Sequence, residues 1–256
     1  MTEKVTTTRR GFGTPHRHFR RVGSTNTVAR ELAAAGAPHG TVVTAAEQTA
    51  GRGRQGRTWT APADSALLYS AVVRPIESRH SVLPLAVALA VCETAEVLRP
   101  GIECTVKWPN DIHLEGRKLA GILIEARPQD GWAVLGVGLN LAIGEAEFPE
   151  ELRDRAISLF GTASAVPFAD LSGKRNSWAE VAAGALSTRL GVWLDADAEA
   201  VLGAWRARDA LRGREVRWEQ GSGVADGVDE RGFLLVRLAD GDRVALGAGD
   251  VHLTGF

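Results

Sequence analysis

Cysteine is scarce in this sequence, and so is an excess of charge of either sign. The 256 residues include only Cys92 and Cys104, too few for a disulfide framework, and this favours a reducing cytosol. Cys92 stands in an apolar run and is interpreted as a buried small hydrophobic residue rather than a catalyst. The formal net charge is −1, whereas a general nucleic-acid binder is expected to carry a basic excess. Any strongly charged site must therefore be local.

Signals for export or for a membrane are also missing. We predict that no apolar run reaches membrane-spanning length, and the first 20 residues are polar and basic without an apolar core. A cytoplasmic protein without a membrane partner is expected. The chain length allows one large domain, or a large domain and a small one.

The larger part of the chain, residues 18–210, has the pattern of an α/β domain. A Ser24-Thr25-Asn26 start and a stop at Gly36 predict a capped helix between them. The helix predicted at 82–99 is almost wholly apolar and should be buried on most sides. Other strands are predicted at 40–48, 65–75, within 104–126 around turns at 109 and 115–116, and at 132–143, and other helices at 178–194 and 198–211.

The two ends of the chain differ from this domain. Residues 1–17 lack periodicity and are predicted to be flexible. From residue 211 to 256 short strands follow one another, with Asp-Gly turns predicted at 226–227 and 240–241. This pattern indicates a small all-β barrel or sandwich at the C-terminal end.

One short stretch concentrates positive charge. GRGRQGRTW, from Gly51 to Trp59 and called the arginine loop below, holds three arginines and three glycines with no acidic residue. A solvated basic loop is the plain interpretation. Glycine, however, suits a close approach of backbone to ligand, and arginine suits paired hydrogen bonds with carboxylate or phosphate. The GxxxxGK[ST] phosphate-loop pattern is absent, and the partial match to GxGxxG is weak. We interpret the loop as a binder of a small anion.

Other polar residues interrupt the strands of the same domain, and each has an ordinary structural explanation when taken alone. KWPND, from Lys107 to Asp111, is compatible with a plain turn, but also with phosphate at the lysine and Mg²⁺ at the carboxylate. Lys118 opens an apolar strand, where a lysine is often only solvated. GVGLN, from Gly136 to Asn140, is thinned by glycine and suits a ligand or backbone packed against it.

Taken in order, these stretches are far more specific. STN (24–26), EQTAGRGRQGRTW (47–59), KWPND, GRKLAGILIE (116–125) and GVGLN closely resemble the biotin–protein ligases, that is, the biotin–[acetyl-CoA-carboxylase] ligases. WRARDALRGREV (205–216) and the β-rich tail resemble their C-terminal domain. The resemblance implies an α/β (α+β) fold with a mixed, mainly antiparallel sheet flanked by helices. It places the biotin- and ATP-binding domain at 18–210 and a small SH3-like β-barrel at 211–256.

The resemblance also implies a reaction in two steps. Biotin's carboxylate attacks the α-phosphate of ATP to give biotinyl-5′-AMP and pyrophosphate. A lysine of a biotin carboxyl carrier domain, from an acyl-CoA or pyruvate carboxylase, then displaces AMP. Lys118, Arg54 and Arg57 are the implied catalytic residues, aided by Arg52 and Mg²⁺, because cations offset the repulsion between a carboxylate and a polyanion. No covalent protein nucleophile is expected.

The family pattern assigns individual residues of this chain to the two substrates. In the nucleotide site, Trp59 would stack on adenine and Asp111 would bind Mg²⁺. The implied biotin site consists of Ser24, Thr25, Asn26, Gln48, Arg52, Gly53, Arg54, Lys118 and Gly138. The implied ATP site consists of Arg54, Arg57, Trp59, Lys107, Asn110, Asp111, Lys118 and Asn140.

Two other functions share parts of this pattern: a lipoate or octanoyl ligase or transferase of the same fold, and a non-enzymatic biotin-binding sensor. The arginine loop together with KWPND matches biotin ligases better than the first. The presence of Lys118 and of the arginines argues against the second. Only about 20 residues precede STN, so no helix-turn-helix domain and no sequence-specific DNA binding are expected. A monomer or a weak homodimer is expected.

Overall fold

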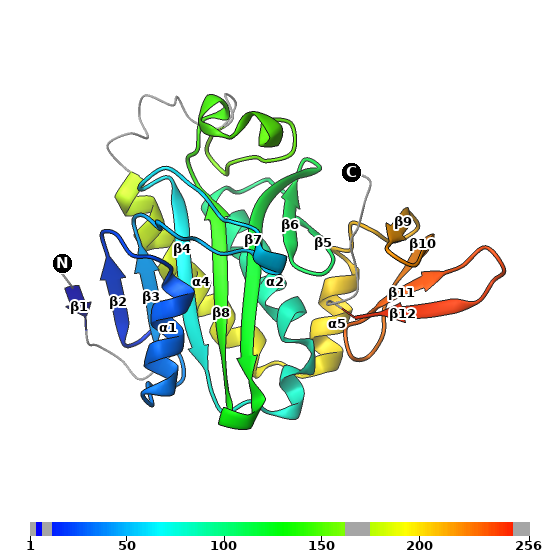
Figure 1. Cartoon of the computed structure of the whole chain (residues 1–256), viewed down its shortest axis with the longest axis horizontal. Helices are drawn as coiled ribbons and strands as arrows, with labels where there is room; N and C mark the ends of the chain where they lie inside the picture. Colours follow the sequence, from blue (N-terminus) through cyan, green and yellow to red (C-terminus); the bar gives the residue numbers. More distant parts are fainter. Residues whose placement is uncertain (1–3, 7–11, 162–174, 248–256) are drawn as a thin grey trace.

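The computed structural model describes residues 4–6, 12–161 and 175–247 of the chain (Figure 1). Its centre is an eight-stranded sheet in the order β1-β2-β3-β4-β8-β7-β6-β5. Neighbouring strands are antiparallel except β2 and β3, which are parallel. The predicted mixed, mainly antiparallel sheet is confirmed. The strands are β1 (Lys4–Thr6), β2 (His16–Phe19), β3 (Val42–Ala45), β4 (Ala66–Val73), β5 (Thr105–Lys107), β6 (Asp111–Leu114), β7 (Arg117–Arg127) and β8 (Trp132–Asn140).

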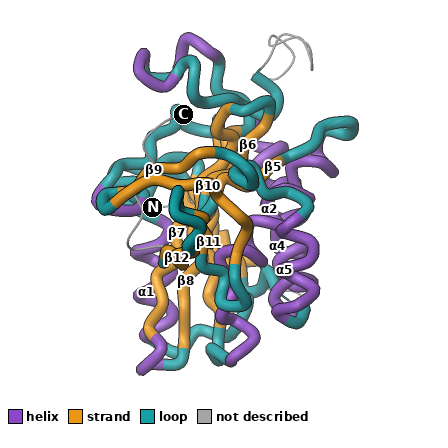
Figure 2. The backbone as a smooth tube through the Cα atoms, turned by 90° about the vertical axis from the view of Figure 1, so that its right-hand side faces the viewer, coloured by secondary structure: helices purple, strands orange, loops and turns teal. Residues whose placement is uncertain are grey.

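Helices cover both faces of this sheet. Helix α1 (Thr25–Ala34) packs on β3, β4 and β8, while α2 (Leu83–Leu98), α4 (Arg175–Asp195) and α5 (Ala198–Arg206) lie on the opposite face (Figure 2). The large hydrophobic core lies under α2 and α4, and a smaller one lies under α1. Short 3-10 turns are η1 (Arg54–Gly56), η2 (Ser78–Val82), η3 (Pro128–Asp130), η4 (Glu145–Glu147) and η5 (Glu150–Leu152).

Helix α2 is the buried apolar helix that the sequence predicted. Together with the end of η2 it forms one stretch, His80–Leu98, that has the length and hydropathy to cross a membrane. The prediction that no apolar run reaches that length was therefore wrong. Because 67% of its 18-residue window is buried inside the fold, the stretch is placed as a core helix between the sheet and its neighbours α4 and α5.

Two boundaries differ from the predictions. A strand, β1, lies inside residues 1–17, where no regular element was expected. It forms by pairing with β2, and a strand of three residues is too short to show a periodic pattern in the sequence. Helix α5 ends at Arg206 instead of 211. The chain beyond it pairs with the edge of the sheet, where Val106 N donates to Arg208 O at 2.7 Å and Ala210 N donates to Val106 O at 3.0 Å.

A separate antiparallel sheet of four strands follows, in the order β12-β11-β10-β9, and matches the expected β-rich C-terminal unit. The turn predicted at 240–241 is confirmed, with Gly241 at φ +94°. The turn predicted at 226–227 was wrong. Those residues lie within β10 at a shift of register, and the chain turns instead at 229–233 around Asp229. The strands are β9 (Glu215–Trp218), β10 (Gly221–Val228), β11 (Leu234–Arg237) and β12 (Arg243–Leu246).

Specific contacts join the small sheet and its connector to the large domain. Trp108 Nε1 donates to Gly232 O at 3.0 Å, and Arg208 Nη2 donates to Glu96 Oε2 at 2.8 Å. Burial works to raise the pKa of Glu96, but hydrogen bonds from Arg208 and from Cys104 N outweigh it and lower the pKa. Cys92 is fully buried, as predicted, and a hydrogen bond with Cys104 together with burial raises its pKa. Burial and the raised pKa both disfavour the reactive thiolate form.

Candidate active site

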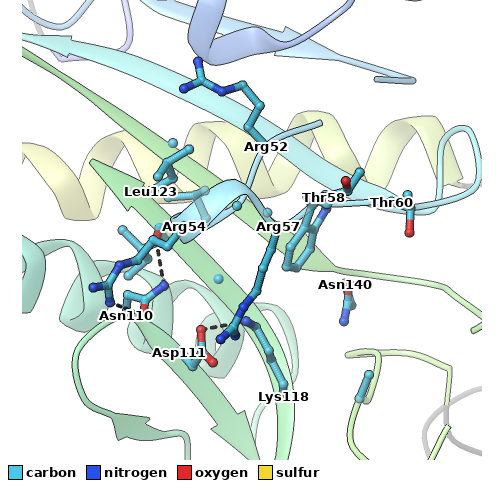
Figure 3. A pocket seen from close by; sticks show the side chains of 18 of the residues that line it. Arg52, Arg54, Arg57, Thr58, Thr60, Asn110, Asp111, Lys118, Leu123 and Asn140 are labelled. Carbon is cyan, nitrogen blue, oxygen red and sulfur yellow. Dashed lines mark hydrogen bonds and ion pairs between the residues drawn. The ribbon is translucent and has the colours of Figure 1, made fainter. Parts of the chain in front are cut away.

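A cavity of about 890 Å³ lies on the α1 face of the large sheet and is bordered by the arginine loop (Figure 3). It brings together residues that are far apart in the sequence, from Ser24 at the start of α1 to Ala156 beyond β8. Every residue that the family resemblance assigned to a site lines it: Ser24, Thr25, Asn26, Gln48, Arg52, Gly53, Arg54, Arg57, Trp59, Lys107, Asn110, Asp111, Lys118, Gly138 and Asn140.

The floor of the cavity is built by strand register. Leu68, Gly138, Gly121 and Asp111 are paired in one row across β4, β8, β7 and β6. A Cβ atom added at Gly138 would collide with the indole of Trp59, and one at Gly121 would lie 3.1 Å from it. Glycine is therefore required here because a ring lies directly on the backbone. The close approach to the GVGLN backbone that the sequence predicted is present, and it is made by a side chain of this protein, the Trp59 indole.

A second row bears the polar wall next to α1. Ser70 of β4 is fully buried, and its hydroxyl lies 2.6 Å from Asn26 Oδ1 and 2.8 Å from Thr25 Oγ1. Gln48 Oε1 accepts from Thr25 N at 2.7 Å and from Thr25 Oγ1 at 2.9 Å. Asn26 lies against Gly136, where a Cβ would collide with its amide. These four side chains carry no formal charge and are linked to one another by hydrogen bonds. They are called the neutral wall below and consist of Gln48, Thr25, Ser70 and Asn26.

Ser24 has a different role from the one its position predicts. It is the N-cap residue of α1, but its side chain makes no capping hydrogen bond. The residue is 5% exposed and lines the cavity next to Thr25. The STN stretch therefore contributes all three residues to the cavity.

The arginine loop folds as a tight hairpin and is not merely a solvated segment. Arg52 bridges to Thr58, Gly53 N donates to Arg57 O at 2.7 Å, and Trp59 N donates to Gly51 O at 3.1 Å. Its arginines diverge, as Figure 3 shows. Arg52 pairs with Glu125 at 3.0 Å, Arg54 Nη1 donates to Asn110 Oδ1 at 2.9 Å, and Arg57 extends toward Asp111 and Lys118.

The opposite end of the cavity carries an excess of positive charge. Lys118 Nζ lies 2.7 Å from Asp111 Oδ1, and Lys107, Arg54 and Arg155 line the same end. Burial lowers the pKa of Lys107, and Lys118, Arg155 and Arg57 lower it further against the opposing effect of Asp111. Burial also lowers the pKa of Arg54. The positive side chains around Asp111 repel one another, and an anionic ligand would relieve this repulsion. They are called the cationic end below and consist of Arg54, Arg57, Lys107, Lys118 and Arg155.

Trp59 lies between the neutral wall and the cationic end. Its ring rests on Gly138 and Gly121, and Lys118 Nζ is 5.9 Å from its centroid. The indole Nε1 is buried and has no hydrogen-bond partner within the described part of the chain. A ring in this position can contact a ligand that spans both ends, and stacking on adenine stays a prediction.

Asn140 uses its amide to hold a segment of the chain over the cavity. It is 4% exposed, and its Nδ2 donates to Ile157 O at 3.1 Å. The same segment is fastened to Lys118, because Lys118 N donates to Arg155 O at 2.7 Å and Ile157 N donates to Lys118 O at 2.9 Å. Asn140 lines the cavity, while its place near the nucleotide stays a prediction.

Sequence reasoning missed several residues of the cavity. Ser70 does not itself line the cavity but lies behind Thr25 and Asn26, and a serine in a mostly apolar strand was the available signal. His113 lines the cationic end, where Nδ1 lies 3.1 Å from Gly116 O and burial lowers its pKa. Phe148, Leu152 and Arg155 come from a segment with no motif of its own.

The residues of the cationic end do not form a metal site by themselves. Across residues 4–6, 12–161 and 175–247, no group of three or more His, Cys, Asp or Glu side chains could hold a metal ion. Asp111 is paired with Lys118, and the Asn110 amide oxygen accepts from Arg54. One carboxylate suits Mg²⁺ that arrives already bound to phosphates, because Mg²⁺ often takes only one or two protein ligands.

The fold and the cavity define a class of protein. Residues 18–140 match the Biotin/lipoate A/B protein ligase family, and residues 212–253 match the Biotin protein ligase C terminal domain. The chain belongs to the biotin protein ligases. It is 38% identical over 244 residues to the Biotin--[acetyl-CoA-carboxylase] ligase of Mycobacterium tuberculosis, covering 90% of this chain and 86% of that one.

Solved structures agree with this family. A biotin protein ligase from Aquifex aeolicus in complex with biotin and ATP aligns with a TM-score of 0.72 and 26% identity, over 93% of this chain and 98% of that one. A biotin protein ligase from Leishmania major in complex with biotinyl-5-AMP aligns with a TM-score of 0.60 and 25% identity, over 91% and 98%.

Proposed function

We propose that this protein is an ATP-dependent biotin–protein ligase that activates biotin as biotinyl-5′-AMP and transfers it to a lysine of a carrier domain. The observation that carries the proposal is one cavity with a neutral hydrogen-bonding wall at one end and a cationic end at the other. Such a cavity suits a molecule with a neutral polar head and a carboxylate that must meet a polyphosphate. The name of the Mycobacterium tuberculosis relative supports the same activity.

In the first step, a carboxylate oxygen of biotin attacks the α-phosphorus of ATP. A new O–P bond forms, the bond to the bridging oxygen breaks, and pyrophosphate leaves. Lys118, Arg54 and Arg57 offset the repulsion between the two anions from fixed positions around Asp111. Lys107 lies at the same end and is placed to meet phosphate oxygens.

Biotin's neutral head would lie against the neutral wall. The mutual hydrogen bonds of Thr25, Gln48, Ser70 and Asn26 hold their side chains in set orientations before any ligand arrives, which reduces the entropy lost on binding. Ser24 and Gly53 border the same region. The indole of Trp59 would form the surface between biotin and the nucleotide.

In the second step, the neutral amine of the acceptor lysine attacks the carbonyl carbon of biotinyl-5′-AMP. The C–N bond forms, the C–O bond to the phosphate breaks, and AMP and a proton leave. The intermediate must be kept from water between the two steps, and the arginine loop together with the segment around Arg155 lies where it could cover it.

Mg²⁺ is proposed to enter as the MgATP substrate, with Asp111 as its nearest carboxylate. The acceptor is proposed to be a biotin carboxyl carrier domain of an acyl-CoA or pyruvate carboxylase. A cytoplasmic location follows from that acceptor, and a monomer or weak homodimer is proposed as the working form.

Mass spectrometry of an isolated carrier domain tests the function. After incubation with this protein, biotin, ATP and Mg²⁺, its mass should increase by one biotinyl group. No increase, combined with a gain in mass when lipoate replaces biotin, would instead favour a lipoate ligase of the same fold. Biotin-dependent exchange of pyrophosphate into ATP should also occur, and its absence despite biotin binding would favour a sensor.

A further inference from the structure

Glu125 is an ionisable group that the proposed reaction does not use, and its carboxylate accepts hydrogen bonds from three side chains next to the cavity. It lies on β7 and is not among the described residues that line the cavity. Its Oε1 accepts from Arg30 Nη1 at 3.1 Å and from Arg52 Nη2 at 3.0 Å, while its Oε2 accepts from Asn26 Nδ2 at 3.0 Å.

These three partners belong to separate parts of the site. Arg52 is in the arginine loop, Asn26 ends the neutral wall, and Arg30 is one turn further along α1. Asn26 Nδ2 faces acceptors only, Glu125 Oε2 and Leu123 O, so its Oδ1 must face Ser70. The carboxylate therefore sets the orientation of the Asn26 amide and holds the base of the loop at the same time.

We infer that Glu125 is a positioning residue that couples closure of the arginine loop to the orientation of Asn26, and so controls retention of the activated intermediate. The inference rests on the proposed ligase function. Without the negative charge, two guanidinium groups would be left around one neutral oxygen, and their mutual repulsion would push Arg52 and the loop away. The binding of biotin and the closure of the loop would then loosen together.

The carboxylate is ionised under working conditions. Burial acts to raise the pKa of Glu125, but the hydrogen bond from Asn26 and the charges of Arg52 and Arg30 outweigh burial and lower the pKa. A substitution that removes the negative charge of Glu125 therefore removes the ionised form that makes these contacts.

The test compares Glu125→Gln with a matched Glu93→Gln variant, which removes a carboxylate paired with Arg189 at 3.5 Å away from the cavity. In Glu125→Gln, we expect the KM for biotin in pyrophosphate exchange to rise roughly 10-fold or more, the loss expected for charge-assisted hydrogen bonds, with kcat for adenylation near wild type. Biotin labelling of serum albumin without carrier should increase over wild type. Glu125→Asp, which keeps the charge, should recover part of the retention.

Thermal melts separate positioning from loss of folding. The expected result is a near-normal Tm with increased albumin labelling, and Arg52→Gln should give the same labelling without adding to it in the double variant. Labelling and KM equal to wild type in Glu125→Gln, or fully additive effects with Arg52→Gln, would overturn the inference. If the wild-type protein forms no biotinyl-5′-AMP at all, the proposed function fails instead.

Discussion

The neutral wall and the cationic end of the cavity differ in charge and in how their side chains are held. The neutral wall consists of uncharged side chains that hydrogen-bond to one another, and Asn26 is also held by the carboxylate of Glu125 behind it. At the cationic end, Lys107, Lys118 and Arg54 crowd around Asp111 with their charges only partly balanced. The side chains of the wall are oriented by hydrogen bonds, whereas the positive charges of the cationic end favour the binding of an anion. The difference predicts that recognition of biotin and its activation can be altered separately in this cavity.

Lys118→Ala should have the largest effect, because it removes a cation from the centre of the cationic end. The rate of adenylation should fall about 10²-fold or more, as when one donor to a developing negative charge is removed. Biotin binding measured without nucleotide should change much less. Pyrophosphate exchange measures the first quantity and calorimetry the second. Near wild-type exchange would mean that Lys118 is only a partly solvated residue at the start of β7.

Trp59→Ala tests the boundary between the two regions. Loss of a base–aromatic stack is worth roughly 1–3 kcal/mol, or about 5- to 150-fold in the KM for ATP. If the ring serves adenine alone, biotin affinity without nucleotide should be unchanged. Because the indole also rests on Gly138 and Gly121, a parallel loss of biotin affinity would identify Trp59 as a packing residue of the pocket. Titrations with each substrate separately distinguish the two outcomes.

Arg54→Gly examines closure of the loop over the cationic end. The substitution removes a charge-assisted contact of roughly 1.5–3 kcal/mol with Asn110 and frees one more backbone position. Adenylation should persist, since Lys118 and Arg57 remain, but retention of the intermediate should suffer. Labelling of serum albumin in the absence of carrier should therefore exceed that of wild type. Background labelling by both proteins, with unchanged carrier biotinylation, would show that Arg54 takes no part in retaining the intermediate.

Ser70→Ala should have the smallest effect and should be confined to the neutral wall. It removes one uncharged hydrogen-bond donor, so the KM for biotin should rise roughly fivefold. The KM for ATP should stay unchanged, as measured in the same exchange assay. An equal rise in both constants would show that the two regions are not separable.

Prediction from sequence succeeded where a motif is local and failed where a contact is long-range. The arginine loop, KWPND and GVGLN could be recognised, because their residue types and order are specific. Arg52 was expected as a ligand of biotin and as a cation that offsets charge repulsion, and the structure pairs its guanidinium with Glu125, 73 residues away. Glu125 was visible only as the end of a strand, and nothing local connects it to the loop. The early end of α5 was missed for the same reason, because it depends on pairing with Val106.

The sequence by itself determined the family, the order of most elements and many of the side chains that line one cavity. Those features depend on residue type and on short-range periodicity, which a single chain displays directly. Only the tertiary structure decided which charges meet. Strand register places Gly138 and Gly121 under Trp59, Asp111 beside Lys118, and Glu125 between Arg52 and Asn26. Register is set by packing across the whole sheet, and a one-residue slip of a strand would turn the side chains of Asp111, Lys118 or Glu125 to the other face.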